Sequence, residues 1–124
     1  MAATFQAGVS RFTINGVSWR VKAGTCNGSV LEKKLEAMMG PTSLNGFKVT
    51  AIAPYIELDV SLADNFSVKA LEGLTGALVT VETRSGAQYI ITNAGYTADG
   101  AAAFEDGTVK LKFEGETGRE VLPL

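Results

Sequence analysis

The stretch RFTINGVSWRV, residues 11–21, decides the fold class of this chain. An Asn-Gly pair between two alternating apolar runs is the strongest short-range signal of a β-hairpin. With this pair as a two-residue turn, the apolar positions lie opposite one another and share one face, as a half-buried hairpin requires. The residues that we expect in the core from this hairpin are Phe12, Ile14, Val17 and Trp19.

Alternation of apolar and polar residues predicts a long strand at residues 47–61 and another at residues 108–114. The first alternation changes phase at Pro54, where we expect a bulge or a sheet edge because proline cannot donate a hydrogen bond to a neighbouring strand. The second strand has one polar face. Its expected core residues are Val109, Leu111 and Phe113.

A second hairpin is predicted from strands at residues 77–83 and 87–92, joined by Arg-Ser-Gly at 84–86. Before it, residues 67–74 are expected to form a short helix, capped by Asp64 or Ser67 and ended by glycine. The inward-facing residues expected on this helix are Val68 and Leu71.

These elements together predict a mainly β fold. We expect six to eight strands in two packed antiparallel sheets, a β-sandwich or barrel, with one short flanking α-helix. The chain has 124 residues, of which 46% are apolar. This size and composition are consistent with one domain that buries a core.

Residues 29–40 fit two structures. Leu31, Leu35 and Met38 recur at helical spacing among charged residues, so local periodicity predicts an amphipathic helix over residues 30–39. The stretch GPTSLNG that follows, residues 40–46, has the composition of a loop.

The composition argues against an enzyme. The chain has no histidine, which removes the commonest general base and the commonest metal ligand. Glu57 and Asp59 share a strand face, but no third ligand is near them in the sequence, so a solvated face explains them better than an acid–base or metal site. The single cysteine, Cys26, has no histidine to activate it. We therefore expect no catalytic residue, no metal site and no cofactor.

Charge and hydropathy restrict the partners. Residues 1–48 carry six basic and two acidic groups, a net charge of +4, and residues 49–124 carry five basic and eleven acidic groups, a net charge of −6. Opposite-signed surfaces favour self-association in a defined orientation. The longest apolar run, residues 51–56, is far shorter than the ~20 residues of a membrane-spanning helix. We expect no membrane insertion by this chain.

Five stretches follow one another at the spacing of a known family. They are APYIE (53–57), SVKALEGL (67–74), ALVTVET (77–83), YIITNA (89–94) and GTVKLKFEG (107–115). In this order they resemble the tail tube protein family of Mu-like contractile-tailed bacteriophages. The resemblance runs from about Gly8 to Glu116 and departs from the family pattern at residues 30–40 and 101–103.

The resemblance implies a structural virion protein. Six copies of a tail tube protein close into a ring, and rings stack into the inner tube of the tail, the conduit for genome delivery. The implied partners are further copies of the chain and the tail sheath, baseplate hub and tail terminator proteins. The tape measure protein and DNA would pass through the lumen without specific binding. The implied location is the virion tail, assembled in the host bacterial cytoplasm.

The resemblance also implies a single tail-tube domain, residues 1–124, with an N-terminal arm at residues 1–10. It favours a strand at residues 30–36 and a projecting inter-ring loop at residues 37–46 over the helix. This loop is too apolar for a solvated tip, and methionine adapts to irregular partner surfaces. The expected inter-ring contact residues are Met38, Met39 and Leu44.

A tube that passes DNA is expected to have an acidic lumen, because like charge repels the polyanion. All but two of the thirteen carboxylates lie after residue 48, so we expect the strands of this part to line the lumen. The lumen-facing candidates are Glu57, Asp59, Glu82 and Glu114.

Two other functions remain open from the sequence. The tube of a phage-derived contractile injection device, which carries no genome, would use the same fold and the same stacking. A monomeric β-sandwich binding module would need an aromatic-lined concave patch, whereas the ten aromatic residues here mostly fit buried phases.

Overall fold

The computed structural model describes residues 8–19, 21, 25–62 and 67–123, which form eleven β-strands and one 3-10 turn. The expectation of a mainly β fold is confirmed. The strands are β1 (Val9–Ile14), β2 (Val17–Trp19), β3 (Asn27–Ser29), β4 (Lys33–Met39), β5 (Leu44–Ala51), β6 (Tyr55–Ser61), β7 (Ala77–Thr83), β8 (Gln88–Tyr96), β9 (Ala102–Ala103), β10 (Thr108–Glu114) and β11 (Thr117–Val121). The N-terminal arm expected at residues 1–10 overlaps the start of β1, and the rest of it lies largely outside the described residues.

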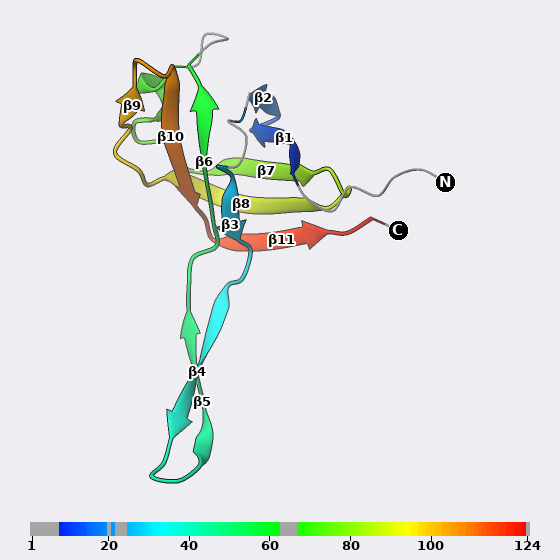
Figure 1. The fold of residues 1–124 in the computed structure, drawn as a ribbon, viewed down its shortest axis with the longest axis vertical. Helices are drawn as coiled ribbons and strands as arrows, with labels where there is room; N and C mark the ends of the chain where they lie inside the picture. Colours follow the sequence, from blue (N-terminus) through cyan, green and yellow to red (C-terminus); the bar gives the residue numbers. More distant parts are fainter. Residues whose placement is uncertain (1–7, 20, 22–24, 63–66, 124) are drawn as a thin grey trace.

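Nine of the strands form one antiparallel sheet that folds over on itself. One half has the order β2-β1-β7-β8-β11, and the other has the order β10-β6-β3, with β9 paired to β10. The halves are joined where Phe113 pairs with Tyr96 and Glu114 pairs with Gly95. Figure 1 shows the strands of the two halves crossing, so the two packed layers are halves of one sheet.

The core lies between the two halves. The Phe12 ring of β1 lies 6.3 Å from the Phe113 ring of β10, and Tyr96 packs its ring edge-on against Phe113 at 5.5 Å. Trp19 and Val68 pack against this core and are partly buried. The other expected core residues that are buried here are Ile14, Leu71, Val109 and Leu111.

Val17, expected in the core, is instead 53% exposed. The predicted register is right, because Ile14 pairs with Val17, and the Asn-Gly turn has the positive φ values, 52° and 87°, that a two-residue hairpin turn favours. β2, however, is a three-residue edge strand, and Val17 lines an open cavity of about 300 Å³ together with Leu71. Val17 therefore lies at the rim of the sheet.

The α-helix expected at residues 67–74 is reduced to a 3-10 turn at Lys69–Leu71. The amide of Ala70 donates to the Ser67 hydroxyl, as a capping residue allows, but Glu72 already has extended backbone angles. So short a segment forms a helix only when tertiary packing supports it. Here Leu71 is buried, Val68 packs only partly against the core, and the chain then turns away. The alternative cap, Asp64, lies outside the described residues.

The remaining strand predictions are confirmed with shifted ends. β7 and β8 form the second hairpin, closed by a hydrogen bond of 3.0 Å from the Gly86 amide to the Thr83 carbonyl. β10 has the predicted bounds and alternates between buried and partly exposed residues. The predicted strand at residues 47–61 divides into β5 and β6, and the buried Pro54 lies between them. The phase change marks the passage from one sheet to another.

The helix that local periodicity predicts over residues 30–39 is wrong. β4 and β5 pair over their whole length as a separate two-stranded sheet, which projects from the body in Figure 1. The loop expected at residues 37–46 is also too long, because only residues 40–43 lie outside the strands. Cross-strand pairing with residues 44–51 outweighs local helical spacing.

Candidate functional site

The β4–β5 hairpin has one apolar face. Directly paired residues of two antiparallel strands lie on the same face, and every second pair returns to that face. The pairs on the apolar face are Leu35 with Val49, Ala37 with Phe47 and Met39 with Leu44.

This apolar face is exposed to solvent in the single chain. Phe47 is 58% exposed, Val49 is 59% exposed and Met39 is 68% exposed. An isolated two-stranded hairpin is at best marginally stable in water. A contiguous apolar face of this kind marks a contact surface, so the hairpin is the strongest candidate for a binding function.

The opposite face of the hairpin is polar. Lys34 and Glu36 lie on it with 4.0 Å between the ammonium nitrogen and a carboxylate oxygen, and Lys48 is the cross-strand partner of Glu36. Met38, which pairs with Gly46, belongs to this face as well. The hairpin is therefore amphipathic, although Lys33, the partner of Ala51, lies at the root of the apolar face.

The predicted contact residues are thus divided between two faces. Met39 and Leu44 lie on the apolar face, whereas Met38 lies on the polar face. Sequence reasoning missed three apolar members of the site, Leu35, Phe47 and Val49. Their alternation is visible in the sequence, but the strand register that unites them on one face is not.

The turn at the tip of the hairpin places the apolar residues beside it on the same face as those further along the strands. The Gly40 amide donates to the Ser43 carbonyl at 2.7 Å, which closes the turn. The register shifts between Met38 and Met39, and Gly46 has a φ of 145° at this irregularity. The shift brings Leu44 opposite Met39, so that the apolar face extends to the tip.

The root of the hairpin is fixed to the body. The Ile52 amide donates to the Glu32 carbonyl at 3.0 Å, which continues the ladder beyond the two strands. The backbone of Val30 then crosses β11 at Gly118, where an added Cβ would come within 2.7 Å of the Val30 Cα atom. Only glycine permits this crossing.

Three of the four lumen candidates share one face of the body. Glu57, Asp59 and Glu114 lie on the outer side of β6 and β10, because their neighbours in each strand point into the core. Lys112 pairs with Glu57, and Lys110 pairs with Asp59, across the same face. The face carries three carboxylates and two lysines, a net charge of −1.

Glu82 does not join this face. It lies on the outer side of β7, in the other half of the sheet, and its carboxylate is 3.1 Å from the Arg11 guanidinium. The two outer faces point away from each other across the core. The structure therefore brings together Glu57, Asp59 and Glu114 but separates Glu82 from them.

The described residues offer little for catalysis. Cys26 lines an apolar cavity of about 410 Å³, and burial raises the pKa of its thiol, which lowers the fraction of reactive thiolate. No three His, Cys, Asp or Glu side chains within the described part of the chain are placed to hold a metal ion. Among the same residues, no helix is long and apolar enough to cross a membrane.

Comparison with known proteins agrees with this geometry. Residues 4–120, nearly the whole chain, match the family model described as phage tail tube protein. No curated protein sequence matches the chain significantly.

Proposed function

Because the chain belongs to the phage tail tube protein family, and so has a structural role in a phage tail, we propose that six copies close into a ring and that rings stack into the inner tube of a contractile tail. The tube is the conduit for the genome, and DNA and the tape measure protein pass through it without specific binding. The sheath, baseplate hub and tail terminator proteins are its other partners. Assembly takes place in the host bacterial cytoplasm.

The observation that carries this proposal is the exposed apolar face of the β4–β5 hairpin. A side chain of this size contributes about 1.5–3 kcal/mol when it is fully buried. The face has five such side chains, which are Leu35, Met39, Leu44, Phe47 and Val49. The hairpin projects along the longest axis of the molecule (Figure 1), so it can reach a copy beyond its own ring.

Ring closure needs a second kind of contact. Unpaired strand edges are templates for pairing with another chain, and contacts between unlike surfaces close into rings. β2, β3 and β11 end the pairing order on the described sheet. We assign the contacts within a ring to these edges and the contacts between rings to the hairpin.

We assign the lumen to the outer face of β6 and β10. Glu57, Asp59 and Glu114 give this face a net negative charge despite Lys110 and Lys112. Repulsion from such a wall keeps a polyanion mobile. Glu82 lies on the opposite outer face, where it pairs with Arg11, so we no longer assign it to the lumen.

Electron microscopy of the concentrated protein tests the function. We expect hexameric rings and stacked tubes, formed spontaneously or on a tail-initiating partner. A strictly monomeric protein in the mature particle would contradict the proposal and leave the binding-module alternative. Tubes assembled in a particle without capsid and genome would instead favour the injection device.

Two neighbouring methionines test the role of the apolar face. Met39→Ser removes an apolar side chain from this face, whereas Met38→Ser makes the same change on the polar face. Both residues are exposed, at 68% and 53%, so both variants should fold. We expect the Met39 variant to stack poorly and the Met38 variant to stack nearly normally. Equal effects would show that the apolar face is not the contact.

A further inference from the structure

A second exposed apolar feature lies in the connection from β9 to β10. Phe104 is 85% exposed, the highest exposure of any large apolar residue in the described part of the chain. It follows the apolar segment Ala101–Ala103, two of whose residues form β9. An exposed phenylalanine costs solvation free energy in the single chain, and aromatic side chains are the commonest anchors of protein contacts.

The backbone holds this phenylalanine in a fixed position. The Gly107 amide donates to the Ala103 carbonyl at 2.8 Å, which closes the turn that carries Phe104. β9 pairs with β10, and the Ala101 amide donates to the Asp99 carboxylate at 3.1 Å. A side chain presented on an ordered turn loses little conformational entropy when it binds.

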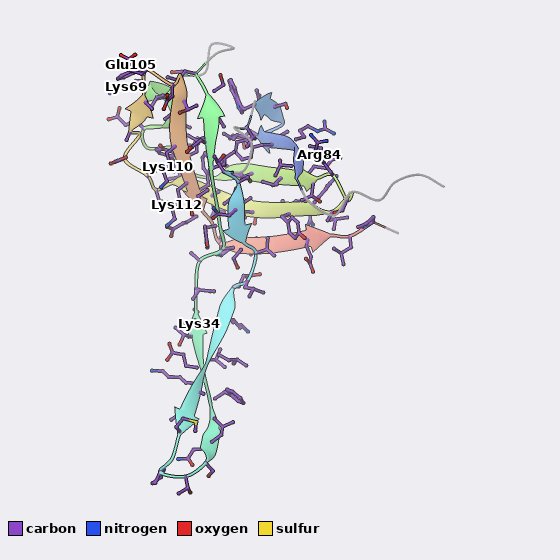
Figure 2. The ribbon with its side chains drawn as sticks, in the orientation of Figure 1. Lys34, Lys69, Arg84, Glu105, Lys110 and Lys112 are labelled. Carbon is purple, nitrogen blue, oxygen red and sulfur yellow. The ribbon has the colours of Figure 1, made fainter. Side chains whose placement is uncertain are left out.

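The turn lies at the end of the molecule opposite the hairpin. In Figure 1, β9 and the hairpin occupy opposite ends of the longest axis, and in Figure 2 Glu105 lies at the β9 end while Lys34 lies along the hairpin. If identical copies stack head to tail along this axis, the hairpin of one copy meets the β9 end of the next. This arrangement is a contact between unlike surfaces, which continues without limit.

The two ends carry opposite charges. The hairpin, residues 33–51, has three lysines and one glutamate, a net charge of +2. The turn, residues 99–107, has Asp99, Glu105 and Asp106 and no basic residue, a net charge of −3. Complementary charge orients two surfaces and disfavours the reverse pairing.

We propose that the Phe104 turn is the surface that receives the β4–β5 hairpin of a copy in the next ring. Phe104 packs on the apolar face of that hairpin, and the carboxylates beside it lie on the side of Lys33, the hairpin lysine of this face. This inference rests on the stacking proposed above and names the partner surface that stacking requires. The occupant is a second copy of this chain.

Phe104→Ser tests the anchor. Because the side chain is almost fully exposed, the variant should keep the thermal midpoint of the wild-type subunit. The critical concentration for tube formation, measured by sedimentation, should rise about tenfold or more. Leu78→Ser is the matched control, since Leu78 is also an exposed apolar residue but lies on the outer face of the interior strand β7, away from the sheet edges and from both proposed stacking surfaces. It should leave the critical concentration unchanged.

A charge reversal with rescue tests the pairing itself. Lys33→Glu with Lys34→Glu should weaken stacking, and so should Glu105→Lys with Asp106→Lys. Combining the four changes restores opposite charges and should restore stacking. Exchanging Lys69 and Glu72, an ion pair on the 3-10 turn near the same end, leaves the net charge unchanged and is the control.

The outcomes separate this inference from the proposed function. Wild-type tubes together with normal stacking of Phe104→Ser would overturn the receiving surface and leave the tube function intact. If each charge-reversed pair weakens stacking and the combined variant does not restore it, that result would also count against the receiving surface. A wild-type protein that never forms tubes would overturn the stacking on which it rests.

Discussion

Met38 and Met39 are adjacent in the sequence and have opposite surroundings. Met38 shares a strand face with Lys34 and Glu36, while Met39 continues the apolar face begun by Leu35. In a strand, successive side chains point to opposite sides. Composition therefore cannot assign a role to either methionine, but register can.

At the residue scale, Gly118→Ala should destabilise the subunit. An added Cβ would overlap the Val30 backbone where the hairpin root crosses β11. Overpacking of this kind costs about 1–3 kcal/mol, and we expect that loss in the free energy of unfolding, followed by urea denaturation and Trp19 fluorescence. Gly95→Ala in β8 is the matched control, because its Cβ would meet the nearest atom, the Leu74 carbonyl oxygen, at 3.3 Å. Equal losses in the two variants would contradict the assignment.

Tyr96 should make the subunit sensitive to alkali. Burial raises the pKa of its phenol, and the neutral hydroxyl donates to the Lys110 carbonyl at 2.9 Å. Because the folded-state pKa lies above the unfolded value, the stabilisation is complete below about pH 10 and is lost as pH rises through the raised pKa. Tyr96→Phe should therefore flatten the fall in denaturation midpoint above about pH 10. Tyr89→Phe, also in β8, leaves the Lys110 bond in place and should keep the wild-type fall.

At the scale of the element, the β4–β5 hairpin is a two-stranded sheet separate from the nine-stranded one. Its ladder is regular and its root is fixed to the body, yet neither of its faces packs on the nine-stranded sheet. Two-stranded ribbons need a third strand or a packed face to become stable. We therefore expect the stability of this element to depend on assembly.

Hydrogen exchange should report that dependence. In the unassembled subunit, the amides of β4 and β5 should exchange much faster than those of β6 and β10, because local opening exposes only the hairpin. In tubes, the same amides should become protected. Peptide-resolved mass spectrometry before and after assembly measures both states. Equal protection of the hairpin in the two states would show that assembly does not stabilise it.

At the scale of the whole molecule, the two outer faces of the folded sheet are unlike. The face of β6 and β10 carries a net charge of −1, and the opposite face holds the Arg11–Glu82 ion pair. Only one of them can line a given channel. In the proposed tube, we therefore expect only charges on the lumen face to act on DNA.

Reversing lumen charge should make the tube retain DNA. Glu57→Lys with Asp59→Lys changes the charge of the β6–β10 face from −1 to +3. Tubes of this variant assembled with short duplex DNA should protect it from nuclease, because phosphate contacts dominate such binding. Wild-type tubes and tubes of the Glu82→Lys variant should not protect the DNA. Protection by the Glu82 variant alone would place the lumen on the other face.

The sequence by itself determined the mainly β class, the Asn-Gly hairpin and its register, and the bounds of β10. These features follow from short-range patterns, namely turn residues that favour positive φ and apolar alternation along one strand. The family could be recognised from ordered stretches along the chain. The sequence also predicted that Met38, Met39 and Leu44 are exposed, because these apolar residues lie in a segment rich in turn residues.

Only the tertiary structure decided the features that depend on distant partners. The pattern at residues 30–39 fits a helix equally well, and the pairing with β5 makes it a strand. The expected helix at residues 67–74 is one turn because only Leu71 of this segment is fully buried and Val68 packs only partly against the core. Val17 is exposed because β2 is a short strand at the edge of the sheet. Glu82 and Glu57 lie on different outer faces because the sheet folds between their strands. In each case a contact far apart in sequence outweighs a local preference, and local patterns carry no information about such contacts.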